Sequence, residues 1–229
     1  TVGKTSANVD LKLSRLVARV ALVKLDVAQL PSGASFTPQE IFMYNVNDKC
    51  TLGGTPSQSA GLKESSIATD AGKCEMTDAN GALIATLTDY AYLSSGLLSL
   101  TKDANNQYVS ATNPYFFYVF PHESANPTKL VVKGLYKSSA SATGTVCYYP
   151  IIVNHGQSGT TITHDGITYT DQETTDDSQI KANCTYGISL SLKGEGSASP
   201  LIDSNSATAN ITMTVAAWSD YTQEVVVGK

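Results

Sequence analysis

Few residues of this 229-residue chain have the types and spacing that catalysis requires. Ser99 and Lys102 show the SxxK spacing of serine acyl-enzymes, but no SDN or KTG segment accompanies them. The segment GKT at the start of the chain resembles the end of a phosphate-binding loop, yet no glycine-rich run or strand leads into it. The sequence does not bring together a nucleophile, a base and a group that orients the base. We therefore expect that the protein is not an enzyme.

The histidines and carboxylates also lack the spacing of a metal site. His122, His155 and His164 stand far apart, in segments that we expect to be loops. Acidic residues between Asp165 and Asp177 offer the oxygen ligands that calcium prefers, but they follow no known calcium-loop spacing. A solvated surface is the simpler interpretation, and we expect no metal and no cofactor.

The four cysteines, Cys50, Cys74, Cys147 and Cys184, follow no CxxC or other zinc-ligand spacing. In an oxidising compartment Cys50 can pair with Cys74, and Cys147 with Cys184. Four cysteines permit three pairings, however, and the sequence does not choose among them. Thiols buried as small hydrophobic groups are an equally good interpretation.

Composition narrows the class of protein. Charged residues make up 15% of the chain, and the formal net charge is −5. An acidic chain lacks the clustered basic surface that nucleic acid binding needs. No apolar run reaches the length of a membrane span, and we expect no secretory leader within the sequence, although one removed ahead of Thr1 is compatible with it.

Strand patterns run along most of the chain. Leu13 to Val27 partly fits helical spacing, but its four valines and the absence of a capping residue favour a strand. Further strands are expected at Glu40 to Val46, Tyr115 to Phe120, Leu130 to Tyr136, Val146 to Asn154, Ile188 to Leu192 and Ile211 to Val215, with a small hairpin at Thr161 to Thr170. Short strands separated by turn signals predict an all-β fold.

Two stretches without a strand pattern interrupt the series of predicted strands. Asn47 to Asn80 is a long insertion between strands, of a length that is usually functional or decorative. A domain boundary fits near His122 to Pro127. We therefore predict two tandem β-sandwich domains of the transthyretin-like, Greek-key kind, one over residues 1–123 and the other over residues 124–229.

The C-terminal tail bears most directly on function. A sheet can be complete by Trp218, which leaves Tyr221 to Gly228 as a short strand without a partner. Such a strand can add to the exposed sheet edge of another molecule, with alternate side chains filling pockets. Repeated head to tail, this contact does not close and builds a filament. The alternative, that the tail pairs within its own sheet, stays open.

Arginine is rare. Only two of the fifteen basic residues are arginine, Arg15 and Arg19, and both lie in LSRLVARVALVKLDV. Compositional drift is one interpretation. The other is that the chain has been cleared of sites for an Arg-specific protease, and that a folded strand protects the remaining two.

A series of motifs, taken in order, resembles the fimbrillins of Bacteroidales type V pili. The motifs are YFFYVFPHESANPTKLVVKGLY, CYYPIIVN, IKANCTYGISLSLKGEGSASP and ITMTVAAWSD, and LSRLVARVALVKLDV resembles the first strand of that family after maturation. His122 stands where the family has Asn, and Ala182 to Tyr186 lacks the family's Arg. The motifs are degenerate singly and fairly specific in this order, and they cover about half of the chain.

The resemblance implies a lipoprotein precursor that is carried to the outer membrane and cut by an Arg-specific protease just ahead of the mature chain. Cutting removes the first strand of the N-terminal domain, and the C-terminal strand of a neighbouring subunit fills the groove. We expect a subunit of a cell-surface fimbrium that polymerises by donor-strand exchange and supports adhesion. Its partners are then other copies or related fimbrial subunits, and surface proteins or glycans.

The residues expected to carry this exchange fall into two groups. The donor residues are Tyr221, Gln223, Val225, Val226 and Val227, and the first strand of the acceptor domain carries Leu13, Val17, Val20, Leu22 and Val23. A monomeric surface lipoprotein that binds glycan or host protein is the alternative, but Asn47 to Asn80 shows no aromatic platform for it. A secreted hydrolase would need a catalytic cluster that the sequence lacks.

Overall fold

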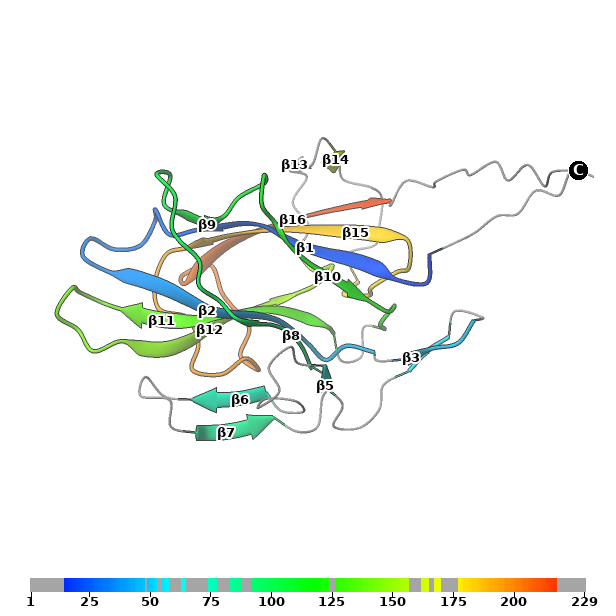
Figure 1. Ribbon diagram of the computed structural model, residues 1–229, viewed down its shortest axis with the longest axis horizontal. Helices are drawn as coiled ribbons and strands as arrows, with labels where there is room; N and C mark the ends of the chain where they lie inside the picture. The colour runs from blue at the N-terminus through cyan, green and yellow to red at the C-terminus, as the bar shows by residue number, and fades with distance from the viewer. Residues whose placement is uncertain are drawn as a thin grey trace, which may run out of the picture.

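The computed structural model in Figure 1 describes most of the chain as strands and connecting loops. The described residues are 15–47, 49–52, 55–57, 63–64, 74–77, 83–87, 92–123, 127–156, 162–164, 167–169 and 177–217. Within these ranges there is no helix, so none that is long and apolar enough to cross a membrane. The predicted all-β class is therefore confirmed.

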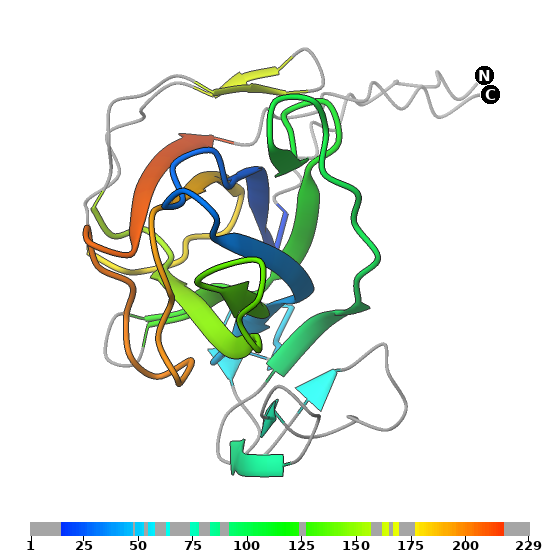
Figure 2. The same cartoon turned by 90° about the vertical axis from the view of Figure 1, so that its left-hand side faces the viewer.

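Two five-stranded sheets form a sandwich (Figures 1 and 2). Sheet A has the order β10 (Tyr115–Val119), β1 (Ala18–Asp26), β15 (Cys184–Leu192), β16 (Ala209–Ala217), and β9 (Gln107–Val109) pairs with the end of β1. Sheet B has the order β12 (Thr145–Ile152), β11 (Lys129–Lys137), β2 (Ser35–Tyr44), β8 (Tyr92–Leu97), β5 (Lys63–Glu64).

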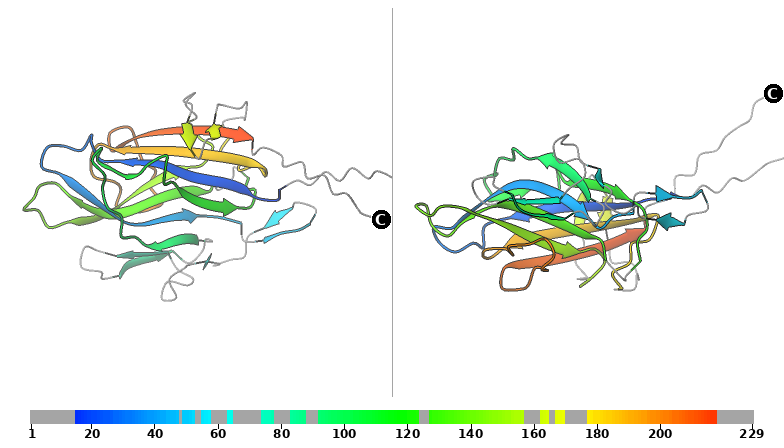
Figure 3. Two further views of the ribbon diagram at one scale, coloured as in Figure 1. Left: turned by 45° about the horizontal axis from the view of Figure 1, so that its top comes forward. Right: turned by 90° about the horizontal axis from the view of Figure 1, so that it is seen from below.

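Three two-stranded pairs lie outside these sheets (Figures 1 and 3). They are β3 (Lys49–Cys50) with β4 (Pro56–Ser57), β6 (Cys74–Thr77) with β7 (Leu83–Leu87), and β13 (Ile162–His164) with β14 (Ile167–Tyr169). The last pair is the small hairpin predicted at Thr161 to Thr170. His164 thus lies in a strand and not in the loop that we expected.

The core lies between the two sheets, where alternate residues of each strand meet. Ile188 and Met213 of sheet A and Ile41 of sheet B are all 0% exposed. Phe36 and Tyr149 pack edge to face, with ring centroids 5.4 Å apart. This alternation is the pattern that identified the strands in the sequence.

The pairing of strands does not follow the predicted domain boundary. β1 lies parallel to β15, with Val20 opposite Tyr186, and β2 pairs with β11, with Phe42 opposite Val131. Each sheet therefore combines strands from both sides of residue 123, and the described residues form one sandwich, not two in tandem. The expectation failed because neighbouring strands in sequence usually pair with each other, whereas these pairs are distant in sequence.

Two strands begin at other residues than the sequence predicted. The first strand begins at Ala18 and not at Leu13, which lies outside the described residues. β2 begins ahead of the expected Glu40 and includes Pro38, which lies opposite Gly134 next to a shift of the pairing register. Because proline has no N–H to donate, it is tolerated in a sheet at such an irregularity.

Candidate strand-accepting edge

Each sheet of the sandwich has two outer strands. These strands differ in whether other parts of the chain hydrogen-bond to their outward N–H and C=O groups. Sheet A ends at β16 and, on its other side, at β10 and β9, whereas sheet B ends at β12 and β5. An outer strand whose N–H and C=O groups are unpaired can accept a strand from another molecule. The closure of each edge therefore decides where such a strand can add.

The loop between β15 and β16 closes the edge of β12. The N–H of Tyr148 donates to the Ser197 carbonyl at 2.8 Å, and the N–H of Ser197 donates to the Tyr148 carbonyl at 2.9 Å. Pro150 has no N–H, and its carbonyl accepts from the N–H of Ser204 at 3.1 Å. Gly196 permits this close approach, because a Cβ there would lie 2.5 Å from the Tyr148 carbonyl oxygen. β12 is thus occupied at the middle of its outer edge, at Tyr148 and Pro150.

The edges at β10 and β5 are short. β10 has five residues and lies between Pro114 and Pro121. Just beyond it, His122 pairs with Ile180 through two backbone hydrogen bonds of 3.0 and 2.8 Å. β5 has two residues, paired in parallel with β8. Short outer strands and flanking prolines both protect a sheet from strand addition.

β16 is different: it has nine residues and, within the described part of the chain, pairs only with β15. The N–H of Lys193 donates to the Thr208 carbonyl at 2.8 Å. Continuing the antiparallel alternation from that bond turns the backbone groups of Ile211, Met213 and Val215 away from β15. Those groups have no hydrogen-bond partner among the described residues.

The side chains of β16 hold this strand in place, although its outer edge has no partner strand among the described residues. Met213 and Val215 are 0% exposed, and Ile211 packs against the same core. The sulfur of Met213 also accepts the N–H of Asn154 at 3.0 Å, which ties β16 to the segment that follows β12. A strand added at β16 would therefore meet a rigid edge with core side chains beside it.

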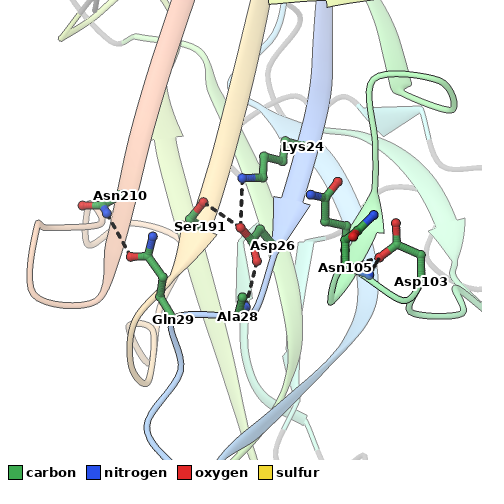
Figure 4. A network of polar contacts seen from close by, with 9 residues as sticks. Lys24, Asp26, Ala28, Gln29, Asp103, Asn105, Ser191 and Asn210 are labelled. Carbon is green, nitrogen blue, oxygen red and sulfur yellow. Dashed lines mark hydrogen bonds and ion pairs between the residues drawn. The ribbon is translucent and has the colours of Figure 1, made fainter.

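Polar contacts fix one end of sheet A (Figure 4). Asp26 accepts the N–H of Ala28 at 2.7 Å and forms an ion pair of 2.9 Å with Lys24, and the hydroxyl of Ser191 lies 3.5 Å from its second oxygen. Burial alone would raise the pKa of the Asp26 carboxyl, but these partners together lower it below its ordinary value. The contacts join β1 to β15, the two strands at the centre of sheet A.

The residues expected in the first strand of the acceptor domain are separated by the structure. Val20 and Leu22 lie in the core, Val23 faces the other side of sheet A, and Val17 precedes β1. β1 is a central strand, between β10 and β15. The expected donor segment, residues 221–227, lies outside the described residues, as does Leu13.

The cysteines form none of the expected disulfides in this structure. Cys50, Cys147 and Cys184 are free thiols, and the side chain of Cys74 is outside the described part. Cys147 faces the core at 1% exposure, and burial raises the pKa of its thiol to about 11. For Cys147 the interpretation as a buried small hydrophobic group is the one that fits.

The residues singled out for chemistry stay apart. Ser99 and Lys102 are exposed in the segment after β8, and the ring Nδ1 of His122 contacts the Glu123 carbonyl at 2.8 Å. Over the ranges that the structure describes, no group of three or more His, Cys, Asp or Glu residues is placed to hold a metal ion.

The two arginines differ in their surroundings. Arg19 lies within β1, between Tyr118 of β10 and Thr185 of β15, and its guanidinium lies 5.3 Å from the centre of the Phe116 ring. Arg15 precedes the strand, and its guanidinium donates to the side chain of Asn183 at 3.1 Å. The expectation that a strand protects both is therefore wrong for Arg15.

Comparison with solved structures connects this sandwich to one known fold. A fimbrilin (fimA) from Porphyromonas gingivalis W83 matches with a TM-score of 0.51 at 19% identity, over 92% of this chain and 60% of that chain. The tip fimbrial protein Mfa3 from Porphyromonas gingivalis, with C-terminal truncation, matches with a TM-score of 0.35 at 12% identity, over 91% of this chain and 54% of that chain. This chain thus spans 60% or less of these structures. No family profile and no curated protein matches it.

Proposed function

We propose that the chain is a structural subunit of a bacterial cell-surface fimbria, which polymerises head to tail by strand exchange. The segment Tyr221 to Val227 of one copy adds to a sheet edge of the next. The observation that carries this proposal is the outer edge of β16, which is unpaired within the described part of the chain, while the loop after β15 covers β12. The likeness in fold to a fimbrilin supports it.

The edge and the donor match in length and chemistry. Seven residues from Tyr221 to Val227 span about 23 Å as a strand, within the length of the nine-residue β16. Their N–H and C=O groups pair with the outward groups of Ile211, Met213 and Val215, each hydrogen bond contributing about 1 kcal/mol. Apolar donor side chains at alternate positions add about 25 cal/mol for each Å² that they remove from water.

The contact joins different surfaces of the two copies. A tail that leaves one copy and an edge that belongs to the next form a heterologous interface, which extends without closing. The product is a fibre whose length is set by the supply of subunits. The role of the chain in this assembly is structural and not catalytic.

The first strand and the arginines belong to maturation in this proposal. β1 lies in the same sheet as β16, so it forms part of the acceptor domain, with Val20 and Leu22 in the core below the edge. An Arg-specific protease removes a preceding strand from a lipidated precursor at the outer membrane. The fibre then supports adhesion through surface proteins or glycans.

The test compares the full precursor with a version that lacks Tyr221 to Lys229, each treated with an Arg-specific protease and run unboiled on a denaturing gel. A ladder of multimers from the intact form alone supports donation by the tail. No ladder from either form contradicts polymerisation and leaves a monomeric surface protein, for which glycan binding is the next assay. Ladders from both forms contradict the donor assignment.

A further inference from the structure

A pocket of about 210 Å³ lies at one end of the sandwich. It lies between the turn that joins β1 to β2 and the loop that joins β8 to β9, at the left of Figure 1 and toward the viewer in Figure 2. Pockets for drug-sized ligands have volumes of about 300–1,000 Å³, so this one takes a smaller molecule. The described residues that line it include none from β16, so it is separate from the candidate strand-accepting edge.

The floor of the pocket is apolar and continues the core. Val27 and Phe36 are buried core residues, and Leu30 packs against the same core. Tyr108 of β9 also lines the pocket, and its hydroxyl donates to the Phe36 carbonyl at 2.8 Å. Because this hydroxyl is already used, Tyr108 adds to the apolar part of the lining. An apolar floor of this kind accommodates the carbon skeleton of a ligand.

Polar side chains form the rim of the pocket. Ser35, Lys102 and Asn106 line it and are exposed to solvent. The ammonium of Lys102, the side-chain amide of Asn106 and the hydroxyl of Ser35 make no hydrogen bond or ion pair with any described residue. The rim therefore offers one positive charge together with donors and acceptors that a ligand can use.

Two carboxylates stand next to lining residues in the sequence, but both accept backbone N–H groups. Asp103 accepts the N–H groups of Asn105 and Gln107, each at 2.8 Å. Asp26 accepts the N–H of Ala28 at 2.7 Å. No carboxylate is among the described residues that line the pocket, so the lysine at its rim has no counter-ion there. The charge of the pocket thus favours an anionic ligand.

Backbone hydrogen bonds hold the two walls of the pocket together. The N–H of Val27 donates to the Asn106 carbonyl at 3.0 Å, which joins the turn after β1 to the loop before β9. The N–H of Ala34 donates to the Pro31 carbonyl at 2.9 Å, which closes the turn ahead of β2. The pocket is therefore formed before a ligand arrives, and binding does not have to order these loops.

We propose that this pocket binds a small hydroxylated carboxylate, the chemistry of an acidic monosaccharide. The carbon ring lies on the apolar floor, the carboxylate meets Lys102, and ring hydroxyls pair with Asn106 and Ser35. Ser99, the other residue of the SxxK pattern, does not line the pocket, so Lys102 has a binding role and no nucleophile beside it. The same chemical group occurs in a free sugar acid and at the end of a glycan, and its binding requires no fibre.

Titration of the full chain with glucuronate, followed by NMR chemical shifts, tests the pocket. The shifts should be confined to the residues that line it, with a dissociation constant in the millimolar range. Glucose, which lacks the carboxylate, should bind about threefold or more weakly. Methyl glucuronide, which is blocked as in a glycan, distinguishes the two sources: equal binding indicates a glycan end, and binding of glucuronate alone a free sugar acid. No shifts with glucuronate, or shifts spread over the whole surface, would overturn the proposal.

Three substitutions assign the polar groups. Lys102→Gln removes the charge and should reduce the affinity for glucuronate to that for glucose, while the affinity for glucose stays the same. Lys49→Gln is the matched control, because it removes the same charge from the exposed strand β3, at the other end of the molecule in Figure 1. Asn106→Gly permits the positive φ of 62° at this position but removes the amide, and should weaken both sugars. Equal affinity of the two lysine variants for glucuronate would overturn the proposal.

Discussion

The backbone of Ser197 pairs with that of Tyr148 through hydrogen bonds of 2.8 and 2.9 Å, so a loop between two strands of sheet A closes the outer edge of sheet B. This contact leaves β16 as the long unpaired edge within the described ranges. A protein that exchanges strands needs one edge open and the others closed, because every open edge is also a site of uncontrolled association. In the proposed fibre, the loop therefore directs the added strand to β16 and away from β12.

Opening the β12 edge should cause unspecific association. Ser197→Pro removes the N–H that donates to Tyr148 and should lower the free energy of unfolding by about 1–3 kcal/mol. The freed edge of β12 should then pair with other copies, which size-exclusion chromatography detects as soluble oligomers. Ser197→Ala keeps the backbone pair and loses only hydroxyl contacts to the Tyr148 and Ser199 carbonyls. Oligomers from this control would contradict the role of the backbone pair.

Blocking the β16 edge should prevent fibre formation without separating β16 from β15. Ile211→Pro removes an outward N–H, whereas Ile211→Ala loses a similar amount of side-chain packing and keeps the N–H. We expect the multimer ladder to disappear with proline and to remain with alanine. Equal ladders from the two variants would mean that strands add elsewhere, and urea unfolding of both shows whether the fold is intact.

The sequence predicts where the strands lie but not which strands pair with each other. Alternation located the strands well, since Leu130 to Tyr136 was expected and Lys129–Lys137 is observed. It did not show that β1 pairs with β15 or that β16 is outermost, because pairing between distant segments leaves no local pattern. Alternation also did not indicate that Thr214, on the face of β16 opposite to Met213, is 0% exposed.

Asp26 should make stability depend on pH in the acid range. Its folded-state pKa is lowered, so its contribution to stability is fully present above the unfolded pKa of about 3.9 and is lost as the pH falls through the folded value. Asp26→Asn should therefore lower the free energy of unfolding at pH 7, and the difference from the unmodified protein should shrink below about pH 4. Urea unfolding at a series of pH values measures this, and a difference that is constant down to pH 2 would contradict it.

The buried thiol should be chemically inert in the folded state. Cys147 is 1% exposed and burial raises the pKa of its thiol to about 11, whereas Cys50 lies in a partly exposed strand. Because the thiolate is the reactive species, alkylation at pH 8 should label Cys50 rapidly and Cys147 only after denaturant is added. Mass spectrometry of the labelled peptides distinguishes the two. Failure of Cys50 to react in the oxidised protein, with reaction restored by a reductant, would show that it forms a disulfide.

The two arginines should differ in their response to an Arg-specific protease. Arg19 lies in a central strand, between Tyr118 and Thr185, so cleavage after it requires β1 to leave the sheet. Cleavage at that site should follow global unfolding and accelerate steeply with urea. Arg15 precedes the strand, and its guanidinium donates to the side chain of Asn183, so cleavage there requires opening of this segment and not of the whole sheet. Time courses by mass spectrometry should show cleavage at Arg15 with little dependence on urea, and equal rates at the two sites without urea would mean that β1 is not a stable central strand.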